Sequence, residues 1–566
     1  MKLFKNPFGK EHPSAEHLQT VQLQIKGMTC EHCARSIEDL LSKIDGVHEV
    51  AVSYSEGRCT CSYDPSKTNR ESIVAAIDAT PSYRVVKQPP QAGAHVSNRF
   101  DLIIIGGGSA AFAAAIQAEE LGLRTLMVNG GLPIGGTCVN VGCVPSKYLI
   151  RAAEAAYRGS HSHFFAIRPR GVDVDFPALI KGKKELVNEL RRKKYAEVVA
   201  DFHFLTMVEG HAVFEDEKTI VVNGTDRYSA LKFLIATGAS PQVPPVEGLE
   251  ETGYLTNRTL FELEQRPESL TVLGAGYIGL EIAQTYRRLG SRVRIVELFD
   301  RLLPAQAPDV GRVLEVQFRS EGIELLLGHK LTRVEKRNGH LLLHLTQPDG
   351  HTITAEEPGQ LVVATGIRPN TANLGLEKAG VELDGRGFIA VDQFMRTSAQ
   401  HVFAAGDVAN TPAFVFTAAA EGKAAVLNAF TDTVKTMDYS AMPWVVFTDP
   451  QVAGAGMDET EAERAGLPFE VSVLPLSEVP RAIAANDTRG FIKLIRNPDT
   501  DRLIGARIVA PEGGELIQLV SMAMQYGIPV SELGSNMFPY LTLSEGVKLA
   551  AIAFGKEVSK LSCCAS

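Results

Sequence analysis

Residues 99–122 have the sequence RFDLIIIGGGSAAFAAAIQAEELG, and this stretch decides the fold. An apolar run typical of a buried strand leads into Gly106-x-Gly108-x-x-Ala111, and a helical pattern follows. Small residues at these three places permit a tight turn and let the helix N-terminus approach a pyrophosphate. The stretch therefore predicts a strand, a turn and a helix that bind a dinucleotide.

The same pattern recurs about 170 residues later. Residues 270–290, LTVLGAGYIGLEIAQTYRRLG, contain Gly274-x-Gly276-x-x-Gly279 in the same context. One such fingerprint is weak evidence. Two fingerprints, each between a strand and a helix, predict two nucleotide sites in one chain.

The two patterns differ at the position that contacts the ribose. Glu297 lies eighteen residues after Gly279, where a carboxylate can accept a hydrogen bond from a ribose 2′-OH and would repel a 2′-phosphate. This residue favours NADH at the second site. Asn129 lies eighteen residues after Ala111, where an acid is usual. Its amide could still bond the ribose, and the alternative is an ordinary turn residue.

Three later segments each form a predicted strand that ends on small residues. They are FLIATGASP (233–241), LVVATGIRPN (361–370) and VFAAGDVAN (402–410). They resemble flavoproteins with two dinucleotide sites, which implies FAD in the first site and NADPH or NADH in the second. The resemblance also implies cofactor contacts from Gly238 and Gly366, and it places Asp407 beside the ribityl chain and phosphates of FAD.

The eight cysteines are too few for a secreted disulfide framework, but they fall in four close pairs. The pairs are Cys30 with Cys33, Cys59 with Cys61, Cys138 with Cys143, and Cys563 with Cys564. Close pairing indicates thiol chemistry at several places along the chain.

Cys138 and Cys143 lie in GGTCVNVGCVPSK (135–147). A spacing of five residues puts two side chains about 140° apart on a regular helix, so a disulfide between them requires an irregular opening turn. Gly142 and Pro145 permit that irregularity.

The motif in residues 135–147 resembles that of the pyridine nucleotide-disulfide oxidoreductases. The resemblance implies that Cys143 faces the flavin as the charge-transfer thiolate and that Cys138 is the interchange thiol. It places Lys147 near flavin N5 with Glu281 as its ion-pair partner. Gly136 and Thr137 join the cofactor contacts.

Members of that family that act on disulfides carry a histidine base near the C-terminus, paired with a glutamate. This chain has FPYLTLSEG (538–546), with Tyr540 at the histidine position and Glu545 at the glutamate position. A phenol with a pKa of about 10 is a poor base at neutral pH. It can line a soft-metal site or donate a hydrogen bond to a thiolate.

The first ninety residues predict a separate small domain. Their pattern alternates as βαββαβ, the ferredoxin-like order, and GMTCEHC (27–33) resembles the motif of heavy-metal-associated domains. Two thiolates at a helix start, from Cys30 and Cys33, suit Cu(I) or Hg(II) better than four-coordinate Zn(II), and a redox pair is the alternative. Cys59 and Cys61 share one strand face, where packing is favoured over metal ligation.

The whole chain, including its terminal LSCCAS (561–566), resembles the mercuric reductases. The resemblance implies reduction of thiol-bound Hg(II) to Hg(0) for detoxification, with the metal ion passed from the Cys30 pair through Cys563 and Cys564 to the Cys138 pair. It implies a homodimer whose active site is shared between subunits, and a mercury transporter or carrier protein as a further partner. The resemblance also implies that Tyr195 in RRKKYAEVV (191–199) assists the handling of Hg(II) at the active site. The alternative is that Tyr195 belongs to a solvated basic face of a helix.

The expected fold class is α/β, with two Rossmann-type domains, an α+β dimerisation domain and the ferredoxin-like domain in front. The expected boundaries are 1–88 for the metal-binding domain (core 20–88), 89–98 for a linker, 99–245 and 368–438 for the FAD domain, 246–367 for the NAD(P) domain, and 439–566 for the dimerisation domain.

Composition excludes several other functions. A net charge of -9 over 566 residues argues against a nucleic-acid partner. The longest apolar stretch, residues 102–116, is too short for membrane insertion, and the N-terminus has no secretory pattern, so we expect a cytoplasmic protein.

Three rival hypotheses are weaker. A thiol-disulfide reductase of the same fold would need a histidine at position 540. A metal-sequestering protein with a vestigial flavin core does not account for the intact Cys138, Cys143 and Lys147. Palmitoylation of the terminal cysteines lacks a polybasic or amphipathic neighbour.

Overall fold

The computed structural model describes residues 18–26, 31–54, 57–80, 84–86 and 98–557. The chain divides into two compact units, residues 1–98 with 197–203 and residues 99–196 with 204–566. Cys30, Cys563, Cys564 and nearly all of the expected linker lie outside the described residues. No helix within the described ranges is long and apolar enough to span a bilayer.

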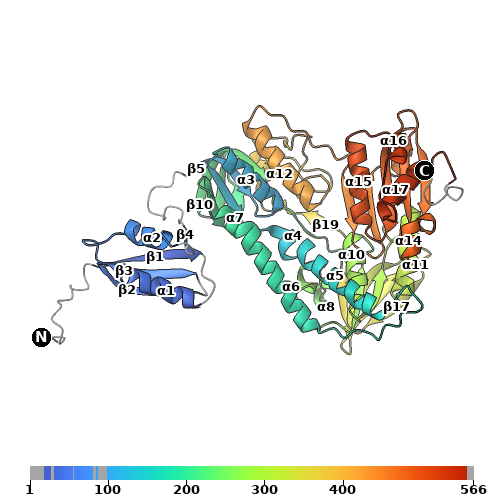
Figure 1. The fold of residues 1–566 in the computed structure, drawn as a ribbon, viewed down its shortest axis with the longest axis horizontal. Coiled ribbons are helices and arrows are strands. Elements are labelled where there is room, and N and C mark those ends of the chain that lie inside the picture. The colour runs from blue at the N-terminus through green and yellow to red at the C-terminus, as the bar shows by residue number, and fades with distance from the viewer. Residues whose placement is uncertain (1–17, 27–30, 55–56, 81–83, 87–97, 558–566) are drawn as a thin grey trace. The chain divides into compact units, whose positions relative to one another are not determined.

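The first unit is a four-stranded antiparallel sheet with two helices (Figure 1). In chain order these are β1 (Gln19–Lys26), α1 (Glu31–Leu41), β2 (Val47–Ser53), β3 (Arg58–Tyr63), α2 (Arg70–Asp78) and β4 (Arg84–Val86). The strand order is β2-β3-β1-β4. Alternating residues of β1 and the apolar stripes of both helices meet in one core that includes Leu23, Ile37 and Ile73. The βαββαβ prediction is confirmed.

The first dinucleotide fold is built around β5 (Arg99–Ile105). Its strand order is β7-β6-β5-β10-β9-β8, with β20 beside β10. The strands are β6 (Thr125–Asn129), β7 (Leu205–Glu209), β8 (Ala212–Phe214), β9 (Thr219–Val222), β10 (Asp226–Ile235) and β20 (Val402–Ala404). Helix α3 (Ser109–Glu120) packs on α12 (Val415–Phe430) (Figure 1). A Cβ at Gly422 would lie 2.1 Å from the Ala110 carbonyl oxygen, so only glycine permits this close approach.

The second dinucleotide fold has four parallel strands in the order β14-β13-β12-β18. They are β12 (Ser269–Leu273), β13 (Arg292–Val296), β14 (Glu324–Leu326) and β18 (Gln360–Val363), with helices α10 (Tyr277–Arg288) and α11 (Pro308–Ser320). An antiparallel meander of β15 (Lys330–Arg337), β16 (His340–Thr346) and β17 (Thr352–Glu357) shares apolar contacts with them. The chain enters and leaves this fold through the paired strands β11 (Ala239–Pro241) and β19 (Ile367–Pro369).

The C-terminal domain is a five-stranded antiparallel sheet in the order β21-β22-β25-β24-β23. The strands are β21 (Pro443–Val446), β22 (Gln451–Gly456), β23 (Glu470–Pro475), β24 (Phe491–Asn497) and β25 (Arg502–Ala510). Helices α15 (Gly513–Gln525), α16 (Val530–Ser535) and α17 (Leu543–Ile552) form one hydrophobic core with it. The expected fold class, including both dinucleotide folds, is confirmed.

Candidate active site

One large cavity collects most of the residues predicted to bind cofactor or carry thiols. Its volume is about 2550 Å³, and both dinucleotide folds and the C-terminal domain form its walls. The predicted residues in its lining are Gly106, Gly108, Asn129, Gly136, Thr137, Cys138, Cys143, Lys147, Gly238, Gly274, Gly276, Glu281, Glu297, Gly366 and Asp407. Ala111, Gly279, Tyr195, Tyr540 and Glu545 are described but are not part of that lining.

The first glycine turn leaves room for a phosphate group. Gly106 has φ +134°, and a Cβ there would lie 2.2 Å from the Ala236 carbonyl oxygen. Gly108 is the N-cap of α3 and faces Gly136 across the turn, where a Cβ on Gly136 would lie 2.7 Å from the Gly108 Cα. Close backbone packing at a helix N-terminus is what a dinucleotide pyrophosphate requires, so these residues fit FAD.

The second turn has the same construction. A Cβ at Gly274 would lie 2.5 Å from the Ala364 carbonyl oxygen, and one at Gly279 would lie 2.1 Å from that of Gly274. A Cβ at Gly276, the N-cap of α10, would meet no atom within 4 Å. The turn is therefore tight on its protein side and open on its cavity side, which fits a second dinucleotide.

Glu297 ends the neighbouring strand with its carboxylate fixed. The side chain is buried and accepts hydrogen bonds from the backbone N–H of Ala275 at 2.6 Å and of Phe299 at 2.9 Å. One backbone bond per oxygen leaves further acceptor capacity for a ribose hydroxyl. The negative charge remains at the edge of the cavity.

Asn129 stands at the equivalent place in the first fold, but its amide donor is used inside the protein. Its Nδ2 lies 3.2 Å from the Leu132 carbonyl oxygen and 3.1 Å from the nearer oxygen of Glu209. Neither interpretation of Asn129 from the sequence, as a ribose contact or as a turn residue, includes Glu209. The sequence held no signal for it, because the contact joins residues 80 positions apart.

The two cysteines flank a break between two helices. Helix α4 (Gly136–Asn140) ends before Gly142, and α5 (Cys143–Ser160) begins with the second cysteine. Gly142 has φ -122° and ψ -111°, and a Cβ there would lie 2.9 Å from the Thr137 carbonyl oxygen. The irregular turn expected from the five-residue spacing is therefore present. Both cysteines are half-buried, and their sulfur atoms are free rather than joined in a disulfide.

Their environments push the two thiol pKa values apart. A hydrogen bond from Cys138 and the charge of Lys147 lower the pKa of Cys143 from 9.0 to about 7, against the effect of burial. The same hydrogen bond, together with burial, raises the pKa of Cys138 well above its usual range. Cys143 is therefore the thiol that ionises first, and Cys138 keeps its proton at neutral pH.

Lys147 is held by an ion pair across the domain boundary. Its Nζ lies 2.8 Å from Glu281 Oε2 on α10 and 4.5 Å from the ring centroid of Phe447. The other Glu281 oxygen accepts a hydrogen bond from the Phe447 backbone N–H at 2.9 Å. The ammonium group is thus fixed one helical turn beyond Cys143. Nothing in the sequence pointed to Phe447.

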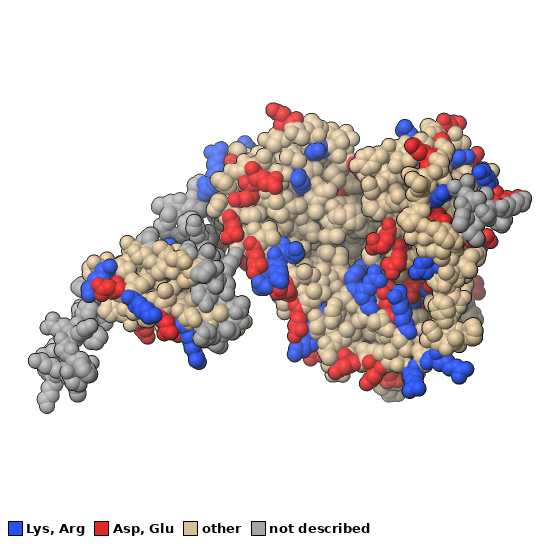
Figure 2. Space-filling model, viewed as in Figure 1, with Lys and Arg blue, Asp and Glu red and all other residues tan. Residues whose placement is uncertain are grey.

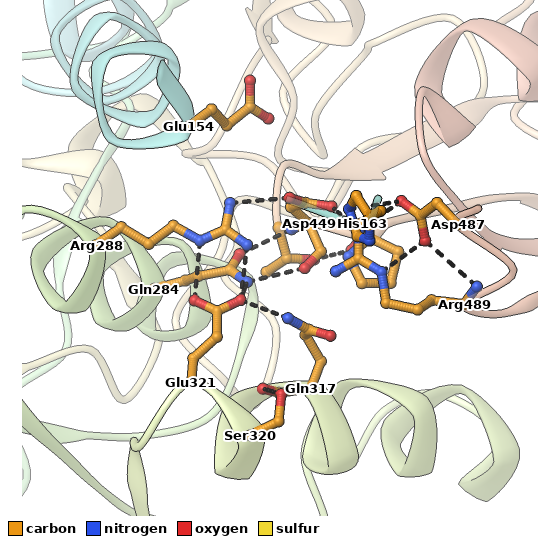
Figure 3. A network of polar contacts seen from close by, with 12 residues as sticks. Glu154, His163, Gln284, Arg288, Gln317, Ser320, Glu321, Asp449, Asp487 and Arg489 are labelled. Carbon is orange, nitrogen blue, oxygen red and sulfur yellow. Dashed lines mark hydrogen bonds and ion pairs between the residues drawn. The ribbon is translucent and has the colours of Figure 1, made fainter. Parts of the chain in front are cut away.

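A buried polar network continues from the same face of α10 (Figure 3). Arg288 lies between Glu321 at 2.6 Å and Asp449 at 2.9 Å, with both Arg288 and Glu321 almost fully buried. Gln284 bonds both the backbone N–H and the carbonyl of Asp449. Removing one member would strand a buried charge, so the network ties α10 and Glu281 firmly to the C-terminal domain.

Asp407 has a buried acidic neighbour that was not predicted. Glu421 is fully buried on α12 and accepts hydrogen bonds at 2.7 Å from the Gly406 backbone N–H and from the Tyr439 hydroxyl. Burial and the charge of Glu421 raise the pKa of Asp407. Glu421 is the only acid in the segment of mostly small and apolar residues TAAAEGKAAV (417–426), and this isolated acid was the signal that could have predicted its role.

Tyr195 lies on a π-helical segment, η2 (Arg192–Ala196). The neighbouring Arg192 and Lys193 are exposed and pair with Glu189, within the mixed charged stripe along α6 (Phe176–Arg191) (Figure 2). The Tyr195 ring is half-buried instead and packs edge-on against Phe112. The wider turn rotates this one residue out of the solvated face.

The Tyr195 ring reaches the segment that precedes Cys138. A Cβ at Gly135 would lie 3.1 Å from that ring. Burial and the nearby Cys138 charge raise the pKa of the Tyr195 phenol, while a hydrogen bond with Ser109 opposes this shift. The phenol therefore stays protonated at neutral pH and can donate a hydrogen bond.

Tyr540 precedes α17 and Glu545 lies in the first turn of that helix, and neither residue lines this cavity. The Tyr540 side chain is 50% exposed. Glu545 has one buried carboxylate oxygen, Oε2, without a hydrogen-bond partner in the described part of the chain. The structure does not bring either residue to the Cys138 pair of its own chain.

In the first unit, Cys59 and Cys61 belong to the hydrophobic core. Both side chains are fully buried, and burial raises the pKa of Cys59 to about 12. Such thiols are poor metal ligands. Cys33 is half-buried in the first turn of α1.

Comparison with protein families matches three regions of the chain. Residues 100–422 match the pyridine nucleotide-disulphide oxidoreductases, and residues 442–551 match the dimerisation domain of that family. Residues 22–81 match the heavy-metal-associated domain.

Curated relatives cover almost the whole chain. A mercuric reductase of Lysinibacillus sphaericus is 39% identical over 96% of this chain and 99% of its own length. A mercuric reductase of Shigella flexneri is 40% identical over the same shares. Among solved structures, the Cu(II) complex of the HOCl-induced flavoprotein disulfide reductase RclA from Escherichia coli is 29% identical, with a TM-score of 0.72 over 81% of this chain and all of that one.

Proposed function

The chain belongs to the pyridine nucleotide-disulphide oxidoreductases and, within them, to the mercuric reductases, and from that premise we propose that it reduces thiolate-bound Hg(II) to Hg(0) with FAD and NADPH or NADH. The observation that carries the proposal is the Cys138 and Cys143 pair, whose thiols share one cavity with two dinucleotide-binding turns. The overall reaction balances as NAD(P)H and Hg(II) giving NAD(P)⁺, H⁺ and Hg(0).

Each part of the cavity has a task in this proposal. The residues of the first turn would hold FAD, and those of the second turn would hold the nicotinamide dinucleotide. When bound, FAD would relay two electrons from the nicotinamide to the thiol pair. The hydrogen bond from Cys138, together with the positive charge of Lys147 that Glu281 holds in place, favours the thiolate form of Cys143.

Two sulfur ligands suit the substrate. Hg(II) is a soft cation, so thiolates bind it in preference to oxygen or nitrogen ligands. Cys143 ionises near neutral pH, and loss of the Cys138 proton on metal binding completes the pair of thiolate ligands. Tyr195 can donate a hydrogen bond to the sulfur beside it. The two electrons pass to the metal ion, which leaves as the neutral atom.

The other predicted residues would serve delivery. The dimerisation domain supports a homodimer. We assign Tyr540 and Glu545 to the partner's cavity, which agrees with neither residue lining the cavity of its own chain. Cys563 and Cys564 would collect Hg(II) from Cys30 and Cys33 or from small thiols. The same proposal sets the enzyme in the cytoplasm, supplied by a mercury transporter or carrier protein.

Reduction of an organic disulfide is the rival reaction. It needs a general acid–base group that deprotonates the attacking thiol and protonates the leaving thiolate near neutral pH. A phenol, with a reference pKa of about 10, is unsuited to that role, and this chain has Tyr540 at the histidine position. Hg(II) requires no such proton transfer. The tyrosine therefore favours the metal substrate.

The test is an anaerobic assay of the purified protein with NAD(P)H, Hg(II) and excess small thiol. We expect one Hg(0) atom released for each NAD(P)H oxidised, and no comparable oxidation with lipoamide or glutathione disulfide in place of Hg(II). Rapid turnover of a disulfide without Hg(0) release would overturn the proposal.

A further inference from the structure

The first dinucleotide fold lacks an acid at the position where the second has Glu297. A carboxylate there normally accepts hydrogen bonds from the ribose hydroxyls of the adenosine half. Asn129 occupies the place and is neutral, and its Nδ2 is committed to the protein. The group that binds this ribose must therefore come from elsewhere.

The adjacent strand brings a carboxylate to the same edge. Strands β6 and β7 are parallel, and their register sets Asn129 opposite Glu209. Asn129 Nδ2 lies 3.1 and 3.2 Å from the two Glu209 oxygens. Asn129 is buried and lines the cavity. Glu209 is exposed, and the residue after it, Gly210, lines the cavity. The carboxylate is thus held at the rim, one strand further out.

The two folds divide the same work differently. In the second, the Glu297 carboxylate itself accepts from the middle residue of the glycine turn, Ala275. In the first, the Asn129 amide oxygen packs on the turn, since a Cβ at Gly107 would lie 2.1 Å from it. The other end of that amide points to Glu209. Asn129 therefore packs against the first glycine turn as Glu297 packs against the second, and in the first fold the carboxylate is on Glu209 instead.

We propose that Glu209 supplies the carboxylate that accepts hydrogen bonds from the adenosine ribose hydroxyls of FAD, and that Asn129 is its positioning residue. The inference rests on FAD being the occupant of the first site, as the proposed function has it. A carboxylate offers about four acceptor positions, of which Asn129 uses two, so two ribose donors can be accommodated.

The test is a competition between two flavins. Holoenzyme is equilibrated with equal excesses of FAD and of FAD whose adenosine ribose lacks the 2′- and 3′-hydroxyls, and the bound flavins are then quantified. Hydrogen bonds to a charged acceptor predict that the unmodified protein retains FAD in about ten- to a hundredfold preference. Glu209→Gln should reduce that ratio toward one.

Two further variants separate a ribose contact from a structural role. Glu215→Gln changes another exposed glutamate of the same domain, one that pairs with Arg227, and should leave the ratio unchanged. Asn129→Asp combined with Glu209→Gln returns the acid to β6 and should restore the preference. A Glu209→Gln protein that binds both flavins more weakly at an unchanged ratio would overturn the inference alone. A protein that retains neither flavin in any variant would overturn the proposed function as well.

Discussion

At neutral pH about half of Cys143 is thiolate, whereas Cys138 remains a thiol, although both lie at one helix break. The difference comes from what each sulfur faces. Cys143 accepts a hydrogen bond from Cys138 and lies near Lys147, whereas Cys138 is the donor of that hydrogen bond. A pair poised in this way offers one ready ligand to a soft cation and a second that follows on binding.

The charge state of Cys143 predicts a pH dependence. In the reduced enzyme, alkylation of one thiol per subunit by iodoacetamide should have its midpoint near pH 7, because the pKa of Cys143 is lowered from 9.0 to about 7. Reaction slows as the pH falls below 7 and the thiolate is protonated. Lys147→Met should move the midpoint to higher pH. A midpoint near 9 in the unmodified protein would contradict this assignment.

Glu297 predicts the cofactor preference. Its fixed carboxylate should repel a 2′-phosphate, so we expect kcat/KM with NADH to be comparable to or above that with NADPH. Glu297→Gln should shift the ratio toward NADPH by about tenfold, since one lost repulsion of this kind is on the order of 1.4 kcal/mol. Asp300→Asn, a change at an exposed acid in the same turn, is the control and should shift it less. A strong NADPH preference in the unmodified enzyme would show that other residues outweigh Glu297.

At the scale of elements, two departures from regular helix shape the site. The break between α4 and α5 brings Cys138 and Cys143 together, and the π-helical η2 turns Tyr195 inward. Both are short irregularities that a regular 3.6-residue period does not produce. The helices α5 and α6 that adjoin these irregular segments contribute residues to the buried core, which stabilises the irregular turns.

Gly142→Ala tests the helix break. The added methyl group would crowd the Thr137 carbonyl oxygen, which lies 2.9 Å from the Cβ position, and should destabilise the protein by about 1–3 kcal/mol. The displaced turn should also weaken the hydrogen bond between the thiols and raise the pKa of Cys143. Thermal unfolding and the alkylation midpoint measure the two effects. Gly385→Ala, where a Cβ would meet open space, serves as the control. Unchanged values in Gly142→Ala would mean that the break does not set the thiol geometry.

Local patterns were sufficient to predict most of the fold. The glycine turns, the βαββαβ order and the three strands ending on small residues all depend on near neighbours. Glu209, Glu421 and Phe447 were not predicted, because each acts through a contact with a distant segment. A role for Tyr195 was predicted from the resemblance, but its π-helical turn was not, since a π-helix and an α-helix have nearly the same sequence signal.

At the scale of the whole molecule, the cavity joins three domains of one unit. Glu281 and Arg288 on α10 fix the second dinucleotide fold to the C-terminal domain, so the thiols, both turns and Phe447 keep one arrangement. In the proposed relay, the terminal cysteines deliver the metal ion to this cavity.

The relay predicts a substrate-dependent defect. Cys563→Ala combined with Cys564→Ala should lower kcat/KM for bulky mercury dithiolates by about a hundredfold, because a tethered ligand pair acts at high effective concentration. Flavin bleaching by NAD(P)H should be unaffected. Ser562→Ala, in the same tail, is the matched control. Normal turnover of bulky complexes by the double variant would remove the tail from the relay.

The central claim is that the Cys138 and Cys143 pair is where Hg(II) receives its electrons, and a single-turnover experiment tests it most directly. Anaerobic enzyme loaded with one Hg(II) per site receives one equivalent of NAD(P)H, and released mercury vapour is measured. We predict one Hg(0) per site from the unmodified protein and none from Cys138→Ser or Cys143→Ser, with flavin still bleached in both variants. Release of Hg(0) by either serine variant in amounts close to those of the unmodified protein would contradict the account.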